Sequence, residues 1–405
     1  MSSTWRLDDA EAHLLSLELF GMRFGLERMR RLLTALGSPQ ERFRAIHVVG
    51  TNGKSSTARM AAALLEAHGV RTGTFLSPHL SSFAERIRIG DADLDSDAFA
   101  AAVQRAAAAA AKVDRTLEEG DRVTQFELLA AAAFAEFARQ GVEVAVVEAG
   151  LGGRHDATNV LGAPVVVLTN VGLEHTRWLG PTVADIAREK LAVVRRGATL
   201  VTGPLQPEVE ELAAQTGATV VPAPPVEAGP AGYQRGNFAV AVSAVRALRG
   251  ELDPALVAEV AARVQVPGRM QVVAQSPLTI YDGAHNPSGM EALVEALDVG
   301  GRPLIAVVSI LDDKDAAGML RALLGKTAGT VFTRSLNPRA LSPATLASLA
   351  EQLGGPASEI VPEPHAAVAR AQELAGLDGA VLATGSIYLV ADLLAEPGRR
   401  RASAL

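Results

Sequence analysis

The sequence contains no cysteine in 405 residues. Disulfide bonds, thiolate metal sites and a cysteine nucleophile are therefore excluded, and the composition fits a reducing compartment. A long basic run is also missing, and the formal net charge is -7, so the chain lacks the electrostatic footprint of a nucleic-acid-binding protein.

Long apolar stretches free of charge are absent too, so no segment is expected to span a bilayer. Residues 1–10 are polar and include Arg6, Asp8 and Asp9, which argues against a signal peptide. We therefore expect a cytoplasmic monomer with no nucleic-acid or membrane partner.

What the chain has is enough apolar sequence for a large core. Apolar residues make up 48% and charged residues 20%, values typical of a globular protein. A length of 405 residues favours two or three domains.

A glycine-rich turn between a predicted strand and a predicted helix is the first candidate site. An apolar run at residues 45–49 precedes it, and a pattern with helical period follows at 57–68. Such a turn points main-chain N–H groups at an anion, while a lysine and a hydroxyl reach the outer phosphates and a magnesium ion. Only two residues separate the glycines, so a plain glycine turn is the alternative. The turn consists of Gly50, Thr51, Asn52, Gly53, Lys54, Ser55 and Ser56.

Polar residues follow two further predicted strands. Glu148 ends an apolar β-branched run at 142–147, and Glu174 and His175 come soon after a strand at 165–169. We expect Glu148 and His175 to lie side by side at adjacent strand ends, where a carboxylate, an imidazole and a hydroxyl suit magnesium. A lone histidine is more often structural. Ser77, in a Ser-Pro-His loop, is on its own better explained as a surface turn.

Thr124 and Glu127 have the spacing of a capping box, so residues 124–127 have a structural explanation as a helix start. Further elements alternate along the chain. Helices are expected at 9–36, 95–113, 124–140, 182–194, 238–248 and 255–261, with strands at 71–76, 200–202 and 218–221.

We place a domain boundary near Pro267-Gly268, because the strand–helix pattern restarts there. The predicted domains are residues 1–268 and residues 269–405. In the second, strands are expected at 270–274, 278–281, 304–310, 330–333, 359–361 and 380–383. Helices are expected at 288–297, 343–353 and 365–375, with one more opened by residues 312–315 and a last one closing the chain. The fold class is α/β with mostly parallel sheets.

Several motifs together resemble the folylpolyglutamate synthase and dihydrofolate synthase family of the Mur ligase superfamily. In chain order they are residues 50–55, 77–80, 148–159, 173–180, 282–287 and 313–315. The resemblance implies a P-loop ATPase-type domain, a C-terminal Rossmann-like glutamate ligase domain, and ATP bound between them. It also implies a reaction in which ATP converts a folate-type carboxylate to an acyl phosphate that L-glutamate attacks. The acceptor would be dihydropteroate, a reduced folate, or both.

The resemblance also implies roles for single residues. Residues 50–56 would bind ATP with Asn237, Arg269 and Asp282, and His285 would lie near the phosphates or the glutamate. Two Mg²⁺ sites would use Ser77, Glu148, His175 and Lys190, the last carbamylated by carbon dioxide. Lys190, His175 and His285 would be catalytic, and the pterin would contact Thr124, Gln125, Phe126, Glu127, His155, Asp156 and Ala157.

The chain departs from the family pattern at Ser55, Gln125, His155 and Glu174. Two alternatives stay open. A peptidoglycan amino-acid ligase is the nearest rival, although a separate N-terminal domain would be expected before its phosphate loop. A P-loop ATPase that acts as a switch or binding module would need neither glutamate nor a second α/β domain.

Overall fold

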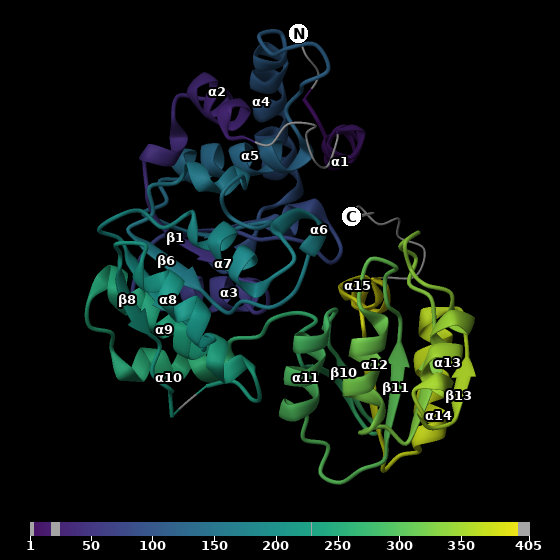
Figure 1. The fold of residues 1–405 in the computed structure, drawn as a ribbon. Coiled ribbons are helices and arrows are strands. Elements are labelled where there is room, and N and C mark those ends of the chain that lie inside the picture. Colours follow the sequence, from purple (N-terminus) through teal and green to yellow (C-terminus); the bar gives the residue numbers. More distant parts are fainter. Residues whose placement is uncertain (1–3, 18–24, 228, 396–405) are drawn as a thin grey trace. The chain divides into compact units, whose positions relative to one another are not determined.

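The computed structural model describes residues 4–17, 25–227 and 229–395 (Figure 1). The chain divides into two compact units. Unit 1 comprises residues 1–230 and 234–264, and unit 2 comprises residues 231–233 and 265–405. Each unit contains one sheet, and the α/β fold class is confirmed.

Unit 1 is built on an eight-stranded sheet in the order β4-β3-β2-β5-β1-β6-β7-β8. Strands β2, β5, β1, β6, β7 and β8 run parallel, whereas β3 and β4 form an antiparallel edge. The strands are β1 Arg44–Val49, β2 Thr72–Phe75, β3 Ile87–Ile89, β4 Ala92–Asp93, β5 Val144–Glu148, β6 Val165–Leu168, β7 Thr199–Thr202 and β8 Thr219–Pro222.

The central strands are buried because helices cover both faces, which explains their nearly unbroken apolar sequences. Helices α3 and α9 pack against each other and against strands on one face. Helix α5 packs against β2, and α7 packs against α8. The helices of unit 1 are α1 Leu7–Ser16, α2 Glu27–Ala35, α3 Lys54–Ala67, α4 Ser96–Asp114, α5 Gln125–Arg139, α6 Thr176–Leu179, α7 Val183–Leu191, α8 Pro207–Ala214, α9 Gln234–Arg249 and α10 Pro254–Arg263, with 3-10 turns η1 Pro39–Glu41, η2 Phe83–Arg86 and η3 Ala157–Val160.

Unit 2 contains a six-stranded sheet in the order β13-β12-β11-β14-β10-β9, in which only β9 is antiparallel to its neighbour. Helices α11, α12 and α13 cover one face with a core that includes Met290, Met319 and Leu346. The elements are β9 Gln271–Gln275, β10 Leu278–Tyr281, α11 Pro287–Ala296, β11 Leu304–Val308, α12 Ala316–Leu324, β12 Gly329–Phe332, α13 Pro343–Gln352, β13 Ser358–Ile360, α14 Pro364–Ala375, β14 Ala380–Thr384 and α15 Ile387–Leu394.

Several sequence expectations need correction. Strands β5 and β6 are not neighbours, because β1 pairs with both and lies between them. Helix α3 begins at Lys54 rather than at residue 57, since Gly53 is its N-cap. Helix α8 and the edge strands β3 and β4 were not expected. The part of the predicted helical region over residues 18–24 lies outside the described residues.

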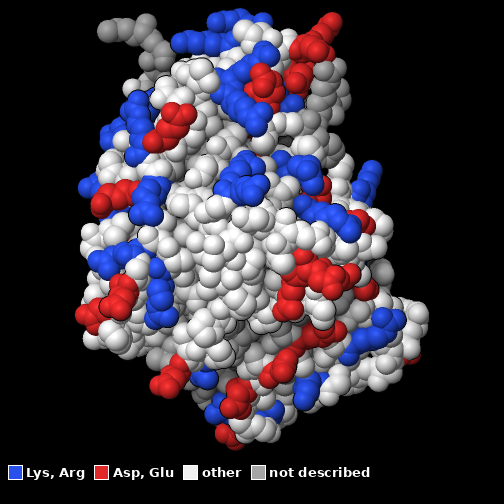
Figure 2. All heavy atoms as spheres, turned by 60° about the vertical axis from the view of Figure 1, so that its left-hand side comes forward, with Lys and Arg blue, Asp and Glu red and all other residues white. Residues whose placement is uncertain are grey.

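None of the helices in the described part of the chain combines the length and apolar character needed to cross a bilayer. On the face drawn in Figure 2, Lys and Arg side chains are interspersed with those of Asp and Glu, around a centre that carries neither kind.

Candidate functional site

The turn between β1 and α3 needs glycine at both of its glycine positions. Gly50 has φ 150° and Gly53 has φ 82°, a region that favours glycine. A Cβ on Gly50 would lie 1.9 Å from Thr169 Oγ1, and one on Gly53 would lie 2.3 Å from Asn237 Oδ1. A side chain at either position would therefore force Thr169 or Asn237 to shift, in addition to the cost of the positive φ.

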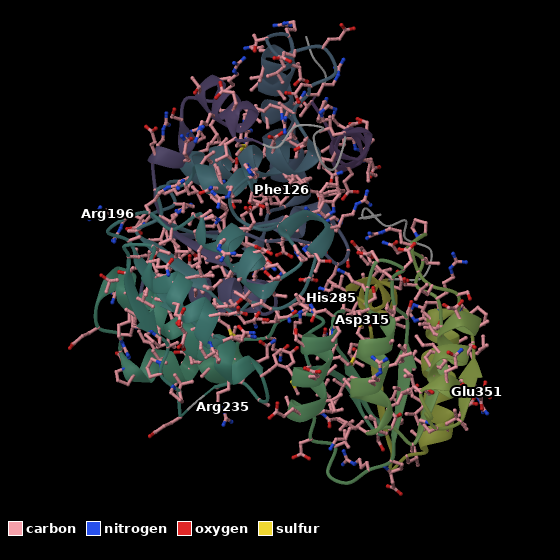
Figure 3. All side chains as sticks on the ribbon, in the orientation of Figure 1. Phe126, Arg196, Arg235, His285, Asp315 and Glu351 are labelled. Carbon is pink, nitrogen blue, oxygen red and sulfur yellow. The ribbon has the colours of Figure 1, made fainter. Side chains whose placement is uncertain are left out.

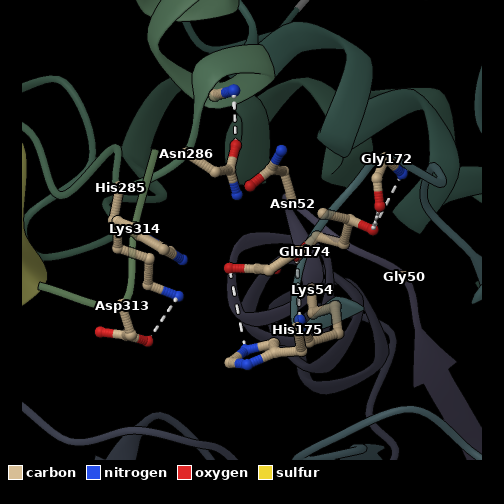
Figure 4. Close-up of polar contacts among 12 residues, drawn as sticks. Gly50, Asn52, Lys54, Gly172, Glu174, His175, His285, Asn286, Asp313 and Lys314 are labelled. Carbon is tan, nitrogen blue, oxygen red and sulfur yellow. Dashed lines mark hydrogen bonds and ion pairs between the residues drawn. The ribbon is translucent and has the colours of Figure 1, made fainter. Parts of the chain in front are cut away.

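Asn170, just beyond β6, holds the middle of this turn. Its main-chain carbonyl accepts a hydrogen bond from Thr51 N at 3.0 Å, and its side-chain Oδ1 accepts one from Asn52 N at 2.9 Å. The Thr51 hydroxyl also bonds Gly172 (Figure 4). Two main-chain N–H groups of the predicted phosphate cradle thus have acceptors within the chain. The N–H groups at the start of α3, which have no intrahelical acceptor, are the ones suited to an anion.

Two lysine side chains donate hydrogen bonds to main-chain carbonyl groups of the turn. Lys54 Nζ donates to Thr51 O at 3.0 Å, and Lys190 Nζ, from α7, donates to Gly50 O at 2.8 Å. Lys190 is 4% exposed. Burial, reinforced by the charge of Lys54, lowers the pKa of Lys190 to about 7, although Glu174 and Asp156 oppose the shift. A large fraction of this amine is therefore neutral near neutral pH.

Glu148 ends β5 with its side chain buried, at 1% exposure. Its carboxylate accepts hydrogen bonds from Ser55 Oγ at 2.9 Å and from Ser77 N at 3.1 Å. The structure thus brings together Ser55, Ser77 and Glu148, which lie far apart in sequence. Hydroxyl and carboxylate oxygens are the donors that magnesium prefers, so this donor set fits the implied ion.

His175 adopts the left-handed conformation at φ 52°, as the N-cap residue of α6. Its Nε2 lies 3.9 Å from Glu174 Oε1 (Figure 4), and its side chain is 38% exposed. The expectation that Glu148 and His175 follow adjacent strands is wrong, because β1 separates β5 from β6. Both strands nevertheless end at the same edge as β1, so a shared ion stays a prediction.

The start of α5, predicted to contact a pterin, is occupied by internal contacts. Thr124 and Glu127 form the predicted capping box, and Glu127 Oε2 also accepts a hydrogen bond from Arg28 Nε at 3.1 Å. Gln125 Nε2 donates to Leu14 O at 2.8 Å. Phe126 is partly buried and packs so close to Gly150 that a Cβ there would lie 2.7 Å from its ring.

The second predicted pterin segment is likewise held by its own loop. Asp156 is buried and accepts hydrogen bonds from the N–H groups of Gly150 and Leu151, each at 2.9 Å, and from the Thr158 hydroxyl. Burial raises the pKa of the Asp156 carboxyl, and these hydrogen bonds oppose the shift. Ala157 is buried, and His155 is exposed.

Unit 2 contains three more of the predicted residues. Asp282, 1% exposed, accepts hydrogen bonds from Tyr233, Met270 and Ala284. The Arg269 side chain lies against Gly283, since a Cβ there would lie 2.6 Å from Arg269 Nη1.

His285 lies just before α11, and its Nδ1 is 2.9 Å from Gly283 O. Asp315 is the N-cap residue of α12, which packs against α11 (Figure 3). Nearby, Lys314 Nζ lies 3.7 Å from Asp313 Oδ2.

The sequence analysis assigned no role to Asn170, Thr169, Tyr233 or Arg28, which hold the candidate residues in place. Asn170 was visible as a polar residue directly after a strand. Tyr233 and Arg28 gave no sequence signal, because their partners lie 49 and 99 positions away.

Comparisons with known proteins point to one family. Residues 48–202 match the Mur ligase middle domain, and residues 268–387 match the Mur ligase glutamate ligase domain. A dihydrofolate synthase/folylpolyglutamate synthase of Mycobacterium tuberculosis is 35% identical over 381 residues, covering 82% of this chain and 78% of that protein. This chain belongs to the folylpolyglutamate synthase/dihydrofolate synthase family.

Other comparisons agree with membership of the folylpolyglutamate synthase/dihydrofolate synthase family. A Mycobacterium tuberculosis folylpolyglutamate synthase solved in complex with ADP superposes with a TM-score of 0.89, at 32% identity, over 98% of this chain and 99% of that one. A probable bifunctional folylpolyglutamate synthase/dihydropteroate synthase of Haloferax volcanii is 34% identical over 95% of this chain. This chain spans 50% of the length of that bifunctional protein.

Within residues 4–17, 25–227 and 229–395, no three His, Cys, Asp or Glu side chains are grouped so as to hold a metal ion.

Proposed function

We propose that this protein is an ATP-dependent ligase that joins L-glutamate to a folate-type carboxylate. The observation that carries the proposal is the arrangement around the turn between β1 and α3, in a chain of this family. Lys190 donates a hydrogen bond to the Gly50 carbonyl, and Glu148 accepts one from Ser55. Membership of the family supplies the substrate class, and the arrangement supplies the groups that phosphoryl transfer needs.

The reaction has two steps. In the first, a carboxylate oxygen of the substrate takes the γ-phosphoryl group of ATP, which gives an acyl phosphate and ADP. In the second, the amine of L-glutamate attacks the acyl carbon, phosphate leaves, and the amine loses a proton as the amide forms. Both steps develop negative charge on oxygen, so they need positioned cations and N–H donors.

The residues of unit 1 would divide this work. The main-chain N–H groups at the start of α3 and the ammonium group of Lys54 would hold the phosphates. Ser55, Ser77, Glu148 and His175 would hold a magnesium ion, which supplies charge neutralisation at the phosphoryl oxygens when bound. Asn237 lies against Gly53 and would contact the nucleotide from α9.

Lys190 would become a carbamate. Its lowered pKa leaves neutral amine available, which is the form that adds to carbon dioxide. The ammonium form first releases one proton. In the addition an N–C bond forms as one C=O π bond of carbon dioxide opens, and a second proton leaves the nitrogen, so a buried cation becomes an anion. The carbamate would hold a second magnesium ion.

In unit 2, Arg269, Asp282 and His285 would serve the nucleotide, the phosphates and the incoming glutamate. The pterin would contact Phe126 and His155, which are more accessible than the internally bonded Thr124, Gln125, Glu127 and Asp156. A cytoplasmic location, a monomeric state and the absence of nucleic-acid and membrane partners stay predictions from the sequence.

A product assay tests the proposal. The full-length chain is incubated with ATP, Mg²⁺, L-glutamate and either dihydropteroate or tetrahydrofolate, and products are separated by mass. We expect one added glutamyl group, with ATP consumption that requires both the pterin and glutamate. ATP hydrolysis that does not depend on glutamate would instead indicate a P-loop ATPase. Ligation of another amino acid in place of glutamate would indicate another Mur-type ligase.

A further inference from the structure

Asp282 joins three separate stretches of unit 2. Its Oδ2 accepts hydrogen bonds from the Tyr233 hydroxyl at 2.5 Å and from Met270 N at 2.8 Å. Its Oδ1 accepts one from Ala284 N at 2.8 Å. The carboxylate follows β10 directly and is almost fully buried. This side chain therefore has a fixed direction before any ligand arrives.

Two of these donors lie where the chain enters unit 2. Tyr233 ends the short segment 231–233, which belongs to unit 2 although both flanking stretches belong to unit 1. Met270 follows the final entry of the chain into unit 2, after Val264. The two segments pack closely, since a Cβ on Gly232 would lie 2.7 Å from Met270 Sδ. Asp282 thus binds both entering segments.

Met270 adds evidence that this arrangement is specified. Its φ is 47°, a left-handed conformation that is unfavourable for a residue with a long side chain. The hydrogen bond from its N–H to Asp282 helps to hold the residue in that conformation. Strained residues of this kind tend to occur where a binding group must be held in one place.

The acceptor capacity of Asp282 limits what a ligand can do. A carboxylate oxygen has two lone-pair positions, and both positions of Oδ2 are used by Tyr233 and Met270. Oδ1 has one position left beside its bond from Ala284. Burial and the negative charge of Asp282 raise the pKa of Tyr233 well above its usual value, so its hydroxyl stays a donor.

We propose that Tyr233 is a positioning residue for nucleotide binding, because its hydroxyl holds Asp282 so that only Oδ1 receives a donor from the ligand. The inference rests on the proposed function, in which Asp282 contacts ATP. A carboxylate accepts hydrogen bonds and repels phosphate, so the donor must be a ribose hydroxyl or the adenine amine. Tyr233 therefore affects nucleotide affinity through Asp282 without touching the reacting groups.

The first test is Tyr233→Phe in the full-length enzyme, which removes one oxygen atom. We expect the KM for ATP to rise about tenfold, as for the loss of one charge-assisted hydrogen bond. The kcat at saturating ATP should stay within about twofold, and the KM for glutamate should not change. The matched control is Tyr281→Phe, because no hydrogen bond of the Tyr281 hydroxyl is found among the described residues. Its KM for ATP should equal that of the parent.

The second test combines Tyr233→Phe with Asp282→Asn. If Tyr233 acts through Asp282, the KM for ATP of the double variant should equal that of Asp282→Asn alone. An Asp282→Asn enzyme with an unchanged KM would refute the nucleotide role of Asp282, and with it the proposed site. A raised KM in Asp282→Asn with no change in Tyr233→Phe would overturn only the role of Tyr233. A Tyr233→Phe chain that loses thermal stability or folding without a selective rise in the KM for ATP would also overturn it.

Discussion

Lys190 donates a hydrogen bond from its buried Nζ to the carbonyl oxygen of Gly50 at 2.8 Å, across 140 positions of sequence. Among the described residues, Lys190 is the only lysine with a buried side chain. This hydrogen bond holds it against the turn between β1 and α3. Because burial lowers the pKa of Lys190 to about 7, the amine can lose its proton at neutral pH.

Lys190→Ala should abolish ligation while leaving ATP binding nearly intact, because the carbamate would act on the substrate side of the phosphates. ATP binding is measured by calorimetry and ligation by product formation. Removal of dissolved carbon dioxide from the parent enzyme should lower its activity, and added bicarbonate should restore it. Full ligase activity in Lys190→Ala would exclude the carbamate role.

The pKa of Lys190 also predicts a pH-dependent stability. Between about pH 7 and its ordinary value of 10.5, the unfolded chain binds a proton that the folded chain lacks, so stability rises with pH in this window. Relative to Lys190→Met, the parent should gain up to about 1.4 kcal/mol per pH unit there. Urea unfolding in carbon dioxide-free buffer measures the difference in the free energy of unfolding between the parent and Lys190→Met at each pH. Lys112→Met, at an exposed position of α4, is the control and should show no such trend.

Glu148→Gln should weaken Mg²⁺-dependent nucleotide binding by about 10- to 100-fold, the usual effect of perturbing a metal site. Ser77 N and Ser55 Oγ donate to different oxygens of Glu148. The amide oxygen of glutamine can still accept from Ser77 N, and its NH2 group can donate to Ser55 Oγ, but the negative charge is lost. Glu143→Gln is the matched control, since Glu143 is exposed and lies at the opposite end of β5. Equal nucleotide affinity in both variants, with and without Mg²⁺, would contradict the assigned site.

Local features of this fold were predictable because local chemistry sets them. The capping box of Thr124 and Glu127 depends on residues three apart, and it forms as predicted. The turn from Gly50 to Gly53 was predicted from its flanking apolar and helical patterns, and both glycines adopt a positive φ that other residues rarely adopt. A buried strand such as β5 is predictable because its sequence is almost continuously apolar and rich in valine.

Long-range relations were harder to predict. The position of β1 between β5 and β6 is set by pairing between distant segments, which hydrophobic period does not encode. The short edge strands β3 and β4 have two or three residues each, too few for a periodic signal. The bond between Tyr233 and Asp282 likewise depends on how the chain returns to unit 2.

Gly53→Ala should both destabilise the protein and impair nucleotide binding. The φ of 82° costs an alanine about 1–2 kcal/mol, and its Cβ would lie 2.3 Å from Asn237 Oδ1. Gly236→Ala is the control, because a Cβ there meets nothing within 4 Å and α9 should gain about 0.5–1 kcal/mol. Adding Asn237→Ala to Gly53→Ala should relieve the clash but not the backbone strain, so unfolding stability should recover only in part. Complete recovery would show that the conformation of Gly53 is unimportant.

A substitution at Glu127 tests whether this side chain stabilises the fold or contacts the substrate. Its carboxylate accepts hydrogen bonds from Arg28 Nε at 3.1 Å and from Thr124 N at 2.9 Å, inside a buried cluster that also pairs Arg28 with Asp121. Glu127→Ala should lower the free energy of unfolding by about 2–4 kcal/mol, since it leaves Arg28 with one partner fewer. Glu119→Ala, at an exposed position of the preceding loop, should have no effect.

A double-mutant cycle tests whether Glu127 stabilises the fold through Arg28. Arg28→Met should destabilise the chain as well, and Arg28→Met combined with Glu127→Ala should cost less than the two single losses added together, because the first substitution already removes the interaction. Urea unfolding of all four chains measures the coupling. If Glu127→Ala unfolds like the parent but raises the KM for the pterin substrate, the carboxylate serves the ligand rather than Arg28.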